Sequence, residues 1–579
     1  MRRRARGFSF FAAAVFCAAV AVGAGSAAAG AKTLPVPQWG LDAAKTPTPA
    51  YAKDAGSVIL SDEYLETVDD QGRAVERERE AIRVLQVQGR DTSCETAYDV
   101  DEKIDYFREW TIAADGWAFQ AKDTDFSEVG DTGVPIELST ERARVVHPPA
   151  ADVGATIICE SEERMAPYDQ EKVWWIQSGI PVVYEALEVD LPPGRAHAES
   201  WHRYPPVKAV EVAPNHWRWE IHNMRRLDLR DVKAHPDWSA LAARMSVDWG
   251  DWAVAGTGNQ WRALGVWYTN LEAHRADPTP QITAEAQQLA SGAPDFYTKL
   301  KDITEYIQKN VRYFVVERGI GGWQSHFAAE IFRNQYGDCK DKTALLISML
   351  QAVGIQADYL AVDDRRGVID PDAPSLYGDH MIAAIEIPAN VEDTSLMGPA
   401  GADFRSLLKY TDQKQRRDAM ETMVDRDLPG ATLDSFLFVL PPDLSKAMEI
   451  HYKVTAPEYA HTAGPLLLVR PRVVSEDAIE FNDDPRTVPI DLGATGQWRS
   501  NFSITLPPGY TVVATPDAVN VDMKFASYSS SSSVKGNVLH YQREYVVRQV
   551  QIPAADAGDF RKFEDAIVED EKEMAVFRK

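Results

Sequence analysis

The sequence has few cysteines and lacks most of the short motifs that identify enzyme classes. Its 579 residues contain four cysteines and no C-x-x-C pair, which argues against a zinc ribbon and against a disulfide oxidoreductase. Neither the P-loop pattern nor G-x-S-x-G occurs, so we expect no P-loop nucleotide site and no serine-hydrolase elbow. His197, Glu199 and His202 lack the H-E-x-x-H spacing. We therefore predict no metal site and no other cofactor.

Long apolar runs and basic residues are also scarce beyond the N-terminus. Residues 1–30 begin with four arginines, run apolar from Phe8 to Val22 and end in small residues, which is typical of a cleaved export signal. No later segment approaches the roughly 18 apolar residues of a membrane span. Removal of the signal arginines takes the net charge from −26 to −30. We predict an exported, periplasmic or extracellular chain that has no transmembrane segment and does not bind nucleic acid.

Export would leave three cysteines in the mature chain: Cys94, Cys159 and Cys339. Two cysteines tend to pair in an oxidising compartment, and an odd one is a candidate reactive thiol. Cys94 and Cys159 lie in one strand-rich region, so a disulfide between them is plausible, although the sequence leaves that pairing open. Cys339 is then the odd cysteine.

The chain divides by pattern into three parts after residue 30. Residues 31–235 alternate short apolar runs with turn signals, which predicts an antiparallel β domain. Residues 236–412 contain a helical apolar pattern from Phe296 to Val311 and the segment around Cys339, and they are expected to form a mixed core. Residues 413–579 return to strands and predict a β-sandwich, closed by an acidic helix from Asp559 to Arg578.

Cys339 follows a turn signal and opens a helical pattern that stops at Gly354. A thiol at a helix N-terminus is exposed to the positive end of the helix dipole, and Lys340 and Lys342 would add positive charge. Both effects favour the thiolate, which is the nucleophilic form. The alternative is a small buried residue, which is the usual role of a free cysteine. The local sequence does not decide between the two.

His380 supplies a second candidate group. Residues 357–362 predict a strand, and His380 comes directly before the apolar strand expected over 381–387. A histidine at a strand edge is often structural. Here the order of a cysteine-bearing helix, a strand and then a histidine is the order that a thiol–imidazole pair requires. We therefore predict that Cys339 and His380 act together.

The run Y-G-D-C-K-D-K at 336–342, the helix to Gly354 and the histidine before an apolar strand resemble the transglutaminase-like core of exported bacterial proteins. That core has a papain-like fold and follows an N-terminal β domain of unknown function. The segments around residues 60–72, 154–158 and 201–204 are similar to that β domain. The resemblance covers nearly all of the mature chain and implies an α+β multidomain protein.

The resemblance further implies a Cys–His–Asp triad, with Cys339 as nucleophile and His380 as general base. The sequence departs from the family at the third member, because the usual Asp-Pro-Thr-like motif is missing. Asp412 and Asp403 are the candidates for orienting the imidazole, and we prefer Asp412 because an apolar pair, Leu407-Leu408, precedes it.

Two functions follow from these features. The first is a cysteine-dependent enzyme that cleaves protein or peptide amide bonds through a thioester, and passes the acyl group to water or to an amine. The backbone N–H of Cys339, with Trp323 or Gln324 as a second donor, would form its oxyanion hole. The second is a catalytically degenerate core in a cell-envelope binding or scaffold protein. The sequence does not choose between hydrolysis and transfer, and it does not predict an oligomeric state.

Overall fold

The structure is a computed structural model. It describes residues 34–130, 137–230, 232–250, 252–253, 260–363, 378–386, 412–439, 449–456, 459–472 and 486–579. The chain forms two compact units, the first of Met1–Asp228 with Asp237–Val391 and the second of Leu229–Pro236 with Glu392–Lys579. The predicted export signal lies outside the described residues. The three predicted domain ranges stay predictions.

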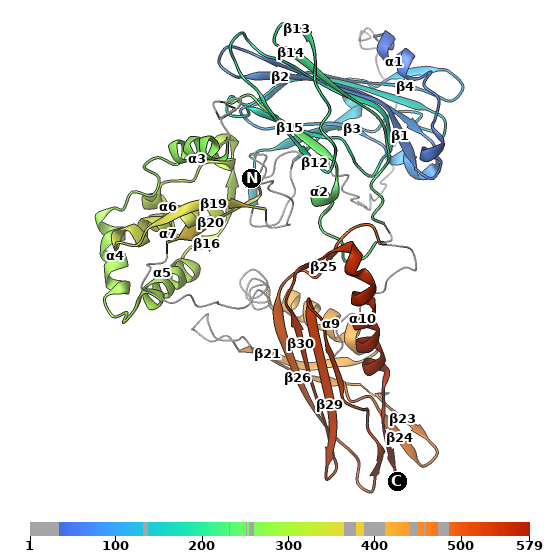
Figure 1. The fold of residues 1–579 in the computed structure, drawn as a ribbon, viewed down its shortest axis with the longest axis vertical. Coiled ribbons are helices and arrows are strands. Elements are labelled where there is room, and N and C mark those ends of the chain that lie inside the picture. Colours follow the sequence, from blue (N-terminus) through green and yellow to red (C-terminus); the bar gives the residue numbers. More distant parts are fainter. Residues whose placement is uncertain are drawn as a thin grey trace, which may run out of the picture. The chain divides into compact units, whose positions relative to one another are not determined.

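An eight-stranded sheet dominates the first unit (Figure 1). Most of its neighbouring strands are antiparallel, as predicted, but β1 pairs with β11 in parallel. In order across the sheet, the strands are β13 (Val210–Ala213), β14 (His216–Met224), β11 (Val182–Asp190), β1 (Ser57–Val68), β2 (Ala74–Val84), β9 (Thr156–Arg164), β4 (Lys103–Ile112) and β5 (Ala118–Gln120).

Two three-stranded sheets complete the β region. One consists of β10 (Glu171–Trp175), β15 (Arg244–Asp248) and β12 (Ala198–His202), and the other of β3 (Cys94–Tyr98), β8 (Arg142–Val146) and β6 (Phe126–Gly130). Trp174 and Met245 of the first small sheet pack with Leu187 and Trp219 of the large sheet in one buried cluster. β15 thus joins the β region although it follows residue 235.

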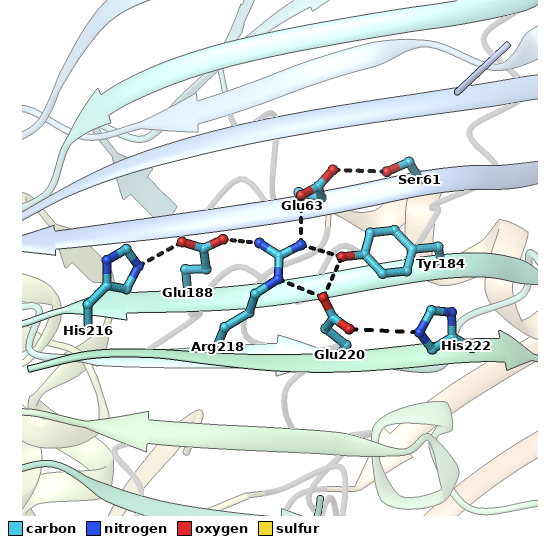
Figure 2. Close-up of polar contacts among 8 residues, drawn as sticks. All are labelled: Ser61, Glu63, Tyr184, Glu188, His216, Arg218, Glu220 and His222. Carbon is cyan, nitrogen blue, oxygen red and sulfur yellow. Dashed lines mark hydrogen bonds and ion pairs between the residues drawn. The ribbon is translucent and has the colours of Figure 1, made fainter. Parts of the chain in front are cut away.

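Arg218 ties three strands of the large sheet together on its polar face (Figure 2). Its guanidinium donates to Glu63 of β1 at 3.2 Å and to Glu220 of β14 at 2.8 Å. It also donates to Glu188 and to Tyr184, both on β11. Because one planar cation serves several oxygen acceptors at once, the cluster stabilises the pairing of β1, β11 and β14.

Helices and a short hairpin make up most of the helical core of the first unit. They are α3 (Gln260–Leu271), α4 (Pro280–Ala290), α5 (Phe296–Asn310), α6 (Ala328–Asn334), α7 (Cys339–Ala352), β19 (Ala357–Val362) and β20 (His380–Ile385). Ile282 of α4, Ile307 of α5, Ile331 of α6 and Leu345 of α7 are buried in one cluster. The helical pattern from Phe296 and the helix that begins at Cys339 are both present as predicted.

The β region and the helical core share contacts inside the first unit. β17 (Val315–Glu317) pairs in parallel with β7 (Glu137–Ser139). The backbone N–H of Gly319 donates to the carboxylate of Asp99 at 3.0 Å. Gly319 has a φ of 53°, and a side chain there would meet the Asp101 carboxylate, so this close approach favours glycine. These contacts connect the segment before Trp323 to the β region.

The second unit contains α9 (Gln413–Asp427), the pair β21 (Thr432–Val439) and β22 (Glu449–Thr455), and two four-stranded sheets. One sheet runs β23 (Ala460–Ala463), β24 (Leu466–Val469), β32 (Ala575–Arg578) and β27 (Thr511–Ala514). The other runs β26 (Gly496–Thr505), β30 (Val538–Val547), β29 (Ala526–Lys535) and β28 (Val519–Asp522).

α10 (Ala557–Lys572) runs along the long strands of the second unit (Figure 1). Phe560 and Phe563 of α10 pack with Phe525 and Tyr528 in one buried cluster. The β-rich C-terminal domain with a late helix is therefore confirmed. The prediction that this helix continues to Arg578 is wrong, because the last residues form β32 and complete a sheet.

Candidate functional site

Cys339 is the first residue of α7, and two aspartates fix the start of that helix. Asp338 is the N-cap and accepts a hydrogen bond from the N–H of Asp341 at 3.2 Å, while the Asp341 carboxylate accepts from the N–H of Asp338 at 3.3 Å. This reciprocal pattern is a capping box. A Cβ at Gly337 would lie 2.5 Å from the Asp341 side chain. The turn before the cysteine therefore favours glycine.

The cysteine pairing that the sequence left open is settled by the structure. Cys94 and Cys159 form a disulfide, with their Cα atoms 6.1 Å apart. Cys339 is a free cysteine and is partly exposed. A partly exposed thiol at a helix N-terminus suits a reactive role better than an inert core role.

The charges beside Cys339 differ from those expected. Lys340 and Asp338 form an ion pair in which both side chains are almost fully buried. Burial opposes the charge of Lys340, yet the Asp338 carboxylate raises its pKa above the ordinary value. Lys342 donates to the carbonyl of Val311 at 3.1 Å. The Lys340 charge is thus largely neutralised by Asp338, so the helix N-terminus supplies more of the positive potential at the thiol than the sequence suggested.

His380 is the first residue of β20 and pairs with Val362 of β19. One turn into α7, the hydroxyl of Thr343 donates to the carbonyl of Met381 at 3.3 Å. Thr343 follows Cys339 by one helical turn and Met381 follows His380 directly. The structure therefore brings the start of α7 beside the start of β20, and a Cys339–His380 contact stays a prediction.

The predicted third triad member is in the second unit of the chain. Asp412 is the N-cap of α9 and accepts a hydrogen bond from the N–H of Gln415 at 2.8 Å. Its own N–H donates to the Gln415 side chain at 2.9 Å. Asp412 thus has a local structural role at a helix start, and its role towards His380 stays a prediction. Asp403 lies outside the described residues.

Both candidate oxyanion donors, Trp323 and Gln324, already make hydrogen bonds to other protein groups. The Gln324 side chain donates to the carbonyl of Leu271 at 2.5 Å and accepts from Arg275 at 2.6 Å. The backbone N–H of Trp323 donates to Ile320 at 2.9 Å. The first N–H groups of a helix have no acceptor within it, so the N–H of Cys339 is the better placed of the predicted donors.

A histidine that sequence reasoning missed lies at the same helix start. The N–H of His326 donates to Asp341 at 2.8 Å, and its ring Nδ1 lies 3.2 Å from the same carboxylate oxygen. The hydrogen bond that the His326 ring makes to the Asp341 carboxylate raises the pKa of His326. Fifteen residues separate the two, and no local pattern signals such a pair. Asp341 therefore both caps α7 and holds His326.

His197, Glu199 and His202, the cluster considered as a metal site in the sequence, contact other protein groups. Glu199 accepts from the indole of Trp219 at 2.7 Å, and the His197 ring packs on Trp217 with 4.3 Å between centroids. His202 Nε2 lies 3.2 Å from the carbonyl of Ala240. Among the described residues, no group of three or more His, Cys, Asp or Glu side chains is arranged to hold a metal ion.

Two parts of the chain match known protein families. Residues 283–367 match the transglutaminase-like superfamily, and residues 466–577 match a domain of unknown function with a solved structure, DUF3858. Cys339 lies inside the first match and His380 beyond it. No curated protein matches the chain.

Within the part that the structure describes, no helix has the length and apolar character needed to cross a membrane.

Among solved structures, a "putative protease" from Parabacteroides distasonis has a TM-score of 0.65 and 14% identity, over 91% of this chain and 100% of that one. An M1 zinc metallopeptidase from Deinococcus radiodurans scores 0.18 at 10% identity, over 34% of this chain and 43% of that one. Native leukotriene A4 hydrolase from Saccharomyces cerevisiae scores 0.20 at 11% identity, over 40% and 36%. Only the first similarity is strong enough to support the fold.

The family matches and the first of these structures agree on the architecture. A β region comes first, a mixed core with Cys339 at a helix start follows, and a β-rich domain closes the chain. The protein is therefore a multidomain α+β chain that carries a transglutaminase-like core, preceded by an antiparallel β region and followed by a DUF3858 domain.

Proposed function

We propose that the protein is an exported cysteine-dependent enzyme that cleaves amide bonds in proteins or peptides. One observation carries the proposal: the free, partly exposed Cys339 begins α7 inside the segment that matches the transglutaminase-like superfamily. The capping box and the buried Asp338–Lys340 pair hold this helix start in one arrangement. Such rigid support is what a nucleophile requires for a defined attack geometry.

In the proposed mechanism, His380 takes the thiol proton and the sulfur of Cys339 attacks the amide carbonyl. The carbon–nitrogen bond breaks, the departing amine receives that proton, and a thioester remains on Cys339. Water then gives a proton to His380 and attacks the thioester carbon, which releases a carboxylic acid and restores the thiol. If a primary amine attacks in place of water, the product is a new amide.

The third member of the triad would be Asp412 or Asp403, orienting the imidazole of His380. The acceptor decides between peptidase and transferase chemistry, and exclusion of water from the closed site would favour an amine. The Cys94–Cys159 disulfide supports the export part of the proposal, since disulfides persist in oxidising compartments.

A second function is favoured by the local role of Asp412. Because its carboxylate caps α9, the triad could lack its orienting carboxylate, and the core would then serve as a binding or scaffold module of the cell envelope. A triad without that carboxylate can still catalyse, but about 10⁴-fold more slowly. The two functions therefore differ in measurable turnover.

The test incubates the mature protein, and a Cys339→Ser variant as matched control, with a library of peptides and an excess of propargylamine. Mass spectrometry then searches for new peptide termini and for amides of propargylamine. New termini favour hydrolysis and propargyl amides favour transfer, and both should vanish in the variant. Product patterns that are the same with both proteins would overturn the proposal and favour the scaffold function.

A further inference from the structure

A cavity of about 720 Å³ lies in the helical core of the first unit. Its walls come from α3, from the β19–β20 hairpin and from single residues of α7 and the loop before α6. Much of the lining is aromatic or aliphatic and includes Trp261, Tyr268, Trp323, Tyr359, Ile347 and Met381. Cavities of about 300–1,000 Å³ commonly hold small organic ligands.

Two lining residues place the cavity beside Cys339. Met381 follows His380, and its carbonyl accepts the hydroxyl of Thr343, one turn below Cys339. Burial first, and then the negative charges of Glu272 and Cys339, raise the pKa of Tyr268 above its ordinary range. The Thr343–Met381 hydrogen bond therefore places the cavity wall at Met381 about one helical turn from Cys339.

Two polar groups in the cavity walls are bonded to other protein groups, while the buried hydroxyl of Tyr359 has no hydrogen-bond partner among the described residues. Glu272 accepts the N–H of Ser325 at 2.9 Å and the hydroxyl of the same serine at 2.5 Å. The hydroxyl of Tyr268 donates to the carbonyl of Trp323 at 2.7 Å. These bonds leave mainly aromatic and aliphatic surface to meet an occupant. Arg262 and Asp358 also line the cavity and are exposed.

Exposed apolar side chains continue this surface towards solvent. Val266 and Leu360 both line the cavity, and they are 53% and 44% exposed. Leu360 pairs across the hairpin with Ile382, which is 42% exposed. Apolar side chains of this size gain free energy when an apolar partner covers them. The surface therefore favours an occupant that is apolar and bulky.

We propose that this cavity binds the bulky apolar side chains, aromatic ones above all, in the acyl part of a peptide substrate. The inference rests on the proposed function of Cys339 and adds the substrate class. A cavity of this volume has room for more than one side chain, so two adjacent apolar residues would bind better than one. Peptides with small or charged residues at these positions would be poor substrates.

The test measures how fast Cys339 is alkylated by two probes that share one reactive group, acetyl-diphenylalanyl and acetyl-diglycyl chloromethyl ketone. The Phe probe should react at least ~10-fold faster, in the range that an apolar pocket supplies. Gly265 lines the cavity and a Cβ there meets no atom within 4 Å, so Gly265→Phe adds a ring at the cavity wall without a clash. Gly558→Phe is the matched control, since Gly558 is also helical and equally open but lies in α10 of the second unit.

The Gly265→Phe variant should bring the ratio of the two rates below ~3, and the Gly558→Phe variant should leave it unchanged. Equal rates in the wild-type protein, or a preference that survives Gly265→Phe, would overturn the inference. Iodoacetamide carries no peptide side chain, so it tests the reactivity of Cys339 separately from the preference of the cavity for apolar side chains. If it also fails to alkylate Cys339, the proposed function is overturned and the inference with it. If it alkylates Cys339 while the preference is absent, only the inference fails.

Discussion

Glu109 provides a prediction whose size can be worked from the structure. The side chain is fully buried in β4, opposite Cys159 of β9 in the register of the large sheet. The hydroxyl of Thr111 donates to its carboxylate at 2.5 Å. Burial raises the pKa of Glu109 from 4.5 to about 7, against the opposing effect of that hydrogen bond. The folded protein therefore keeps this proton at pH values where the unfolded chain has lost it.

This difference makes the sheet less stable as the pH rises. Below pH 4.5 the side chain is protonated in both states and carries no penalty. The penalty grows as the pH rises from 4.5 towards 7 and is complete above that. The gap between 4.5 and about 7 corresponds to about 3 kcal/mol at pH 8, and to less than about 1 kcal/mol at pH 5.

Glu109→Gln removes the ionisation and nearly keeps the shape of the side chain. We expect the opening free energy of the variant to exceed that of wild type at pH 8. This excess should be about 2 kcal/mol larger at pH 8 than at pH 5. Hydrogen exchange of β4 and β9 amides, read by mass spectrometry and corrected for intrinsic rates, measures this locally. A local measurement is needed because a multidomain chain has no single unfolding free energy.

Glu95→Gln is the matched control, since Glu95 is exposed on β3, and it should show no such pH dependence. A Glu109→Gln effect of equal size at pH 5 and pH 8 would refute the reasoning. That result would mean that the carboxyl group titrates in the folded protein as it does in the unfolded chain.

Two further predictions concern stability. Replacing Cys94 and Cys159 together by serine opens a loop of 65 residues and should lower the stability of the β region by about 4 kcal/mol. Hydrogen exchange of β9 amides along a urea titration measures this loss. An unchanged midpoint of that titration would contradict the prediction. Lys340→Met leaves the Asp338 carboxylate buried without its cation and should cost about 3–5 kcal/mol, which a second change, Asp338→Asn, should largely restore. Hydrogen exchange of the α7 amides in the single and double variants would show this, and additive losses would argue against the pair.

The elements with strong local signals could be predicted from the sequence. The helix at Cys339 has a cap before it, an apolar stripe along it and a glycine with φ of 79° at Gly354 after it. The strand over 357–362 appears with the predicted bounds. The sequence also carries a cap signal at 412–415, because an aspartate followed three residues later by a glutamine is a cap pattern, and the structure uses Asp412 in that way.

Features that depend on distant partners could not be predicted. The sequence predicts that Lys340 adds positive charge beside Cys339, but tertiary packing buries it against Asp338. His326 meets Asp341 only because the loop before α6 folds onto the start of α7. The parallel pairing of β1 with β11 likewise joins strands more than a hundred residues apart. Periodicity reports which face of an element is buried, but not which distant element covers it.

The measurement that tests the account most directly is the pH dependence of Cys339 alkylation by iodoacetamide. With Cys94 and Cys159 bonded, Cys339 is the one free cysteine among the described residues, and a protein prepared without residues 1–30 contains no other cysteine. We predict an alkylation rate that depends on both pH and His380, because the imidazole would take the thiol proton. His380→Ala should move the midpoint of this pH profile up, while His461→Ala, on an exposed strand of the second unit, should not. A pH profile that His380→Ala leaves unchanged would contradict the account.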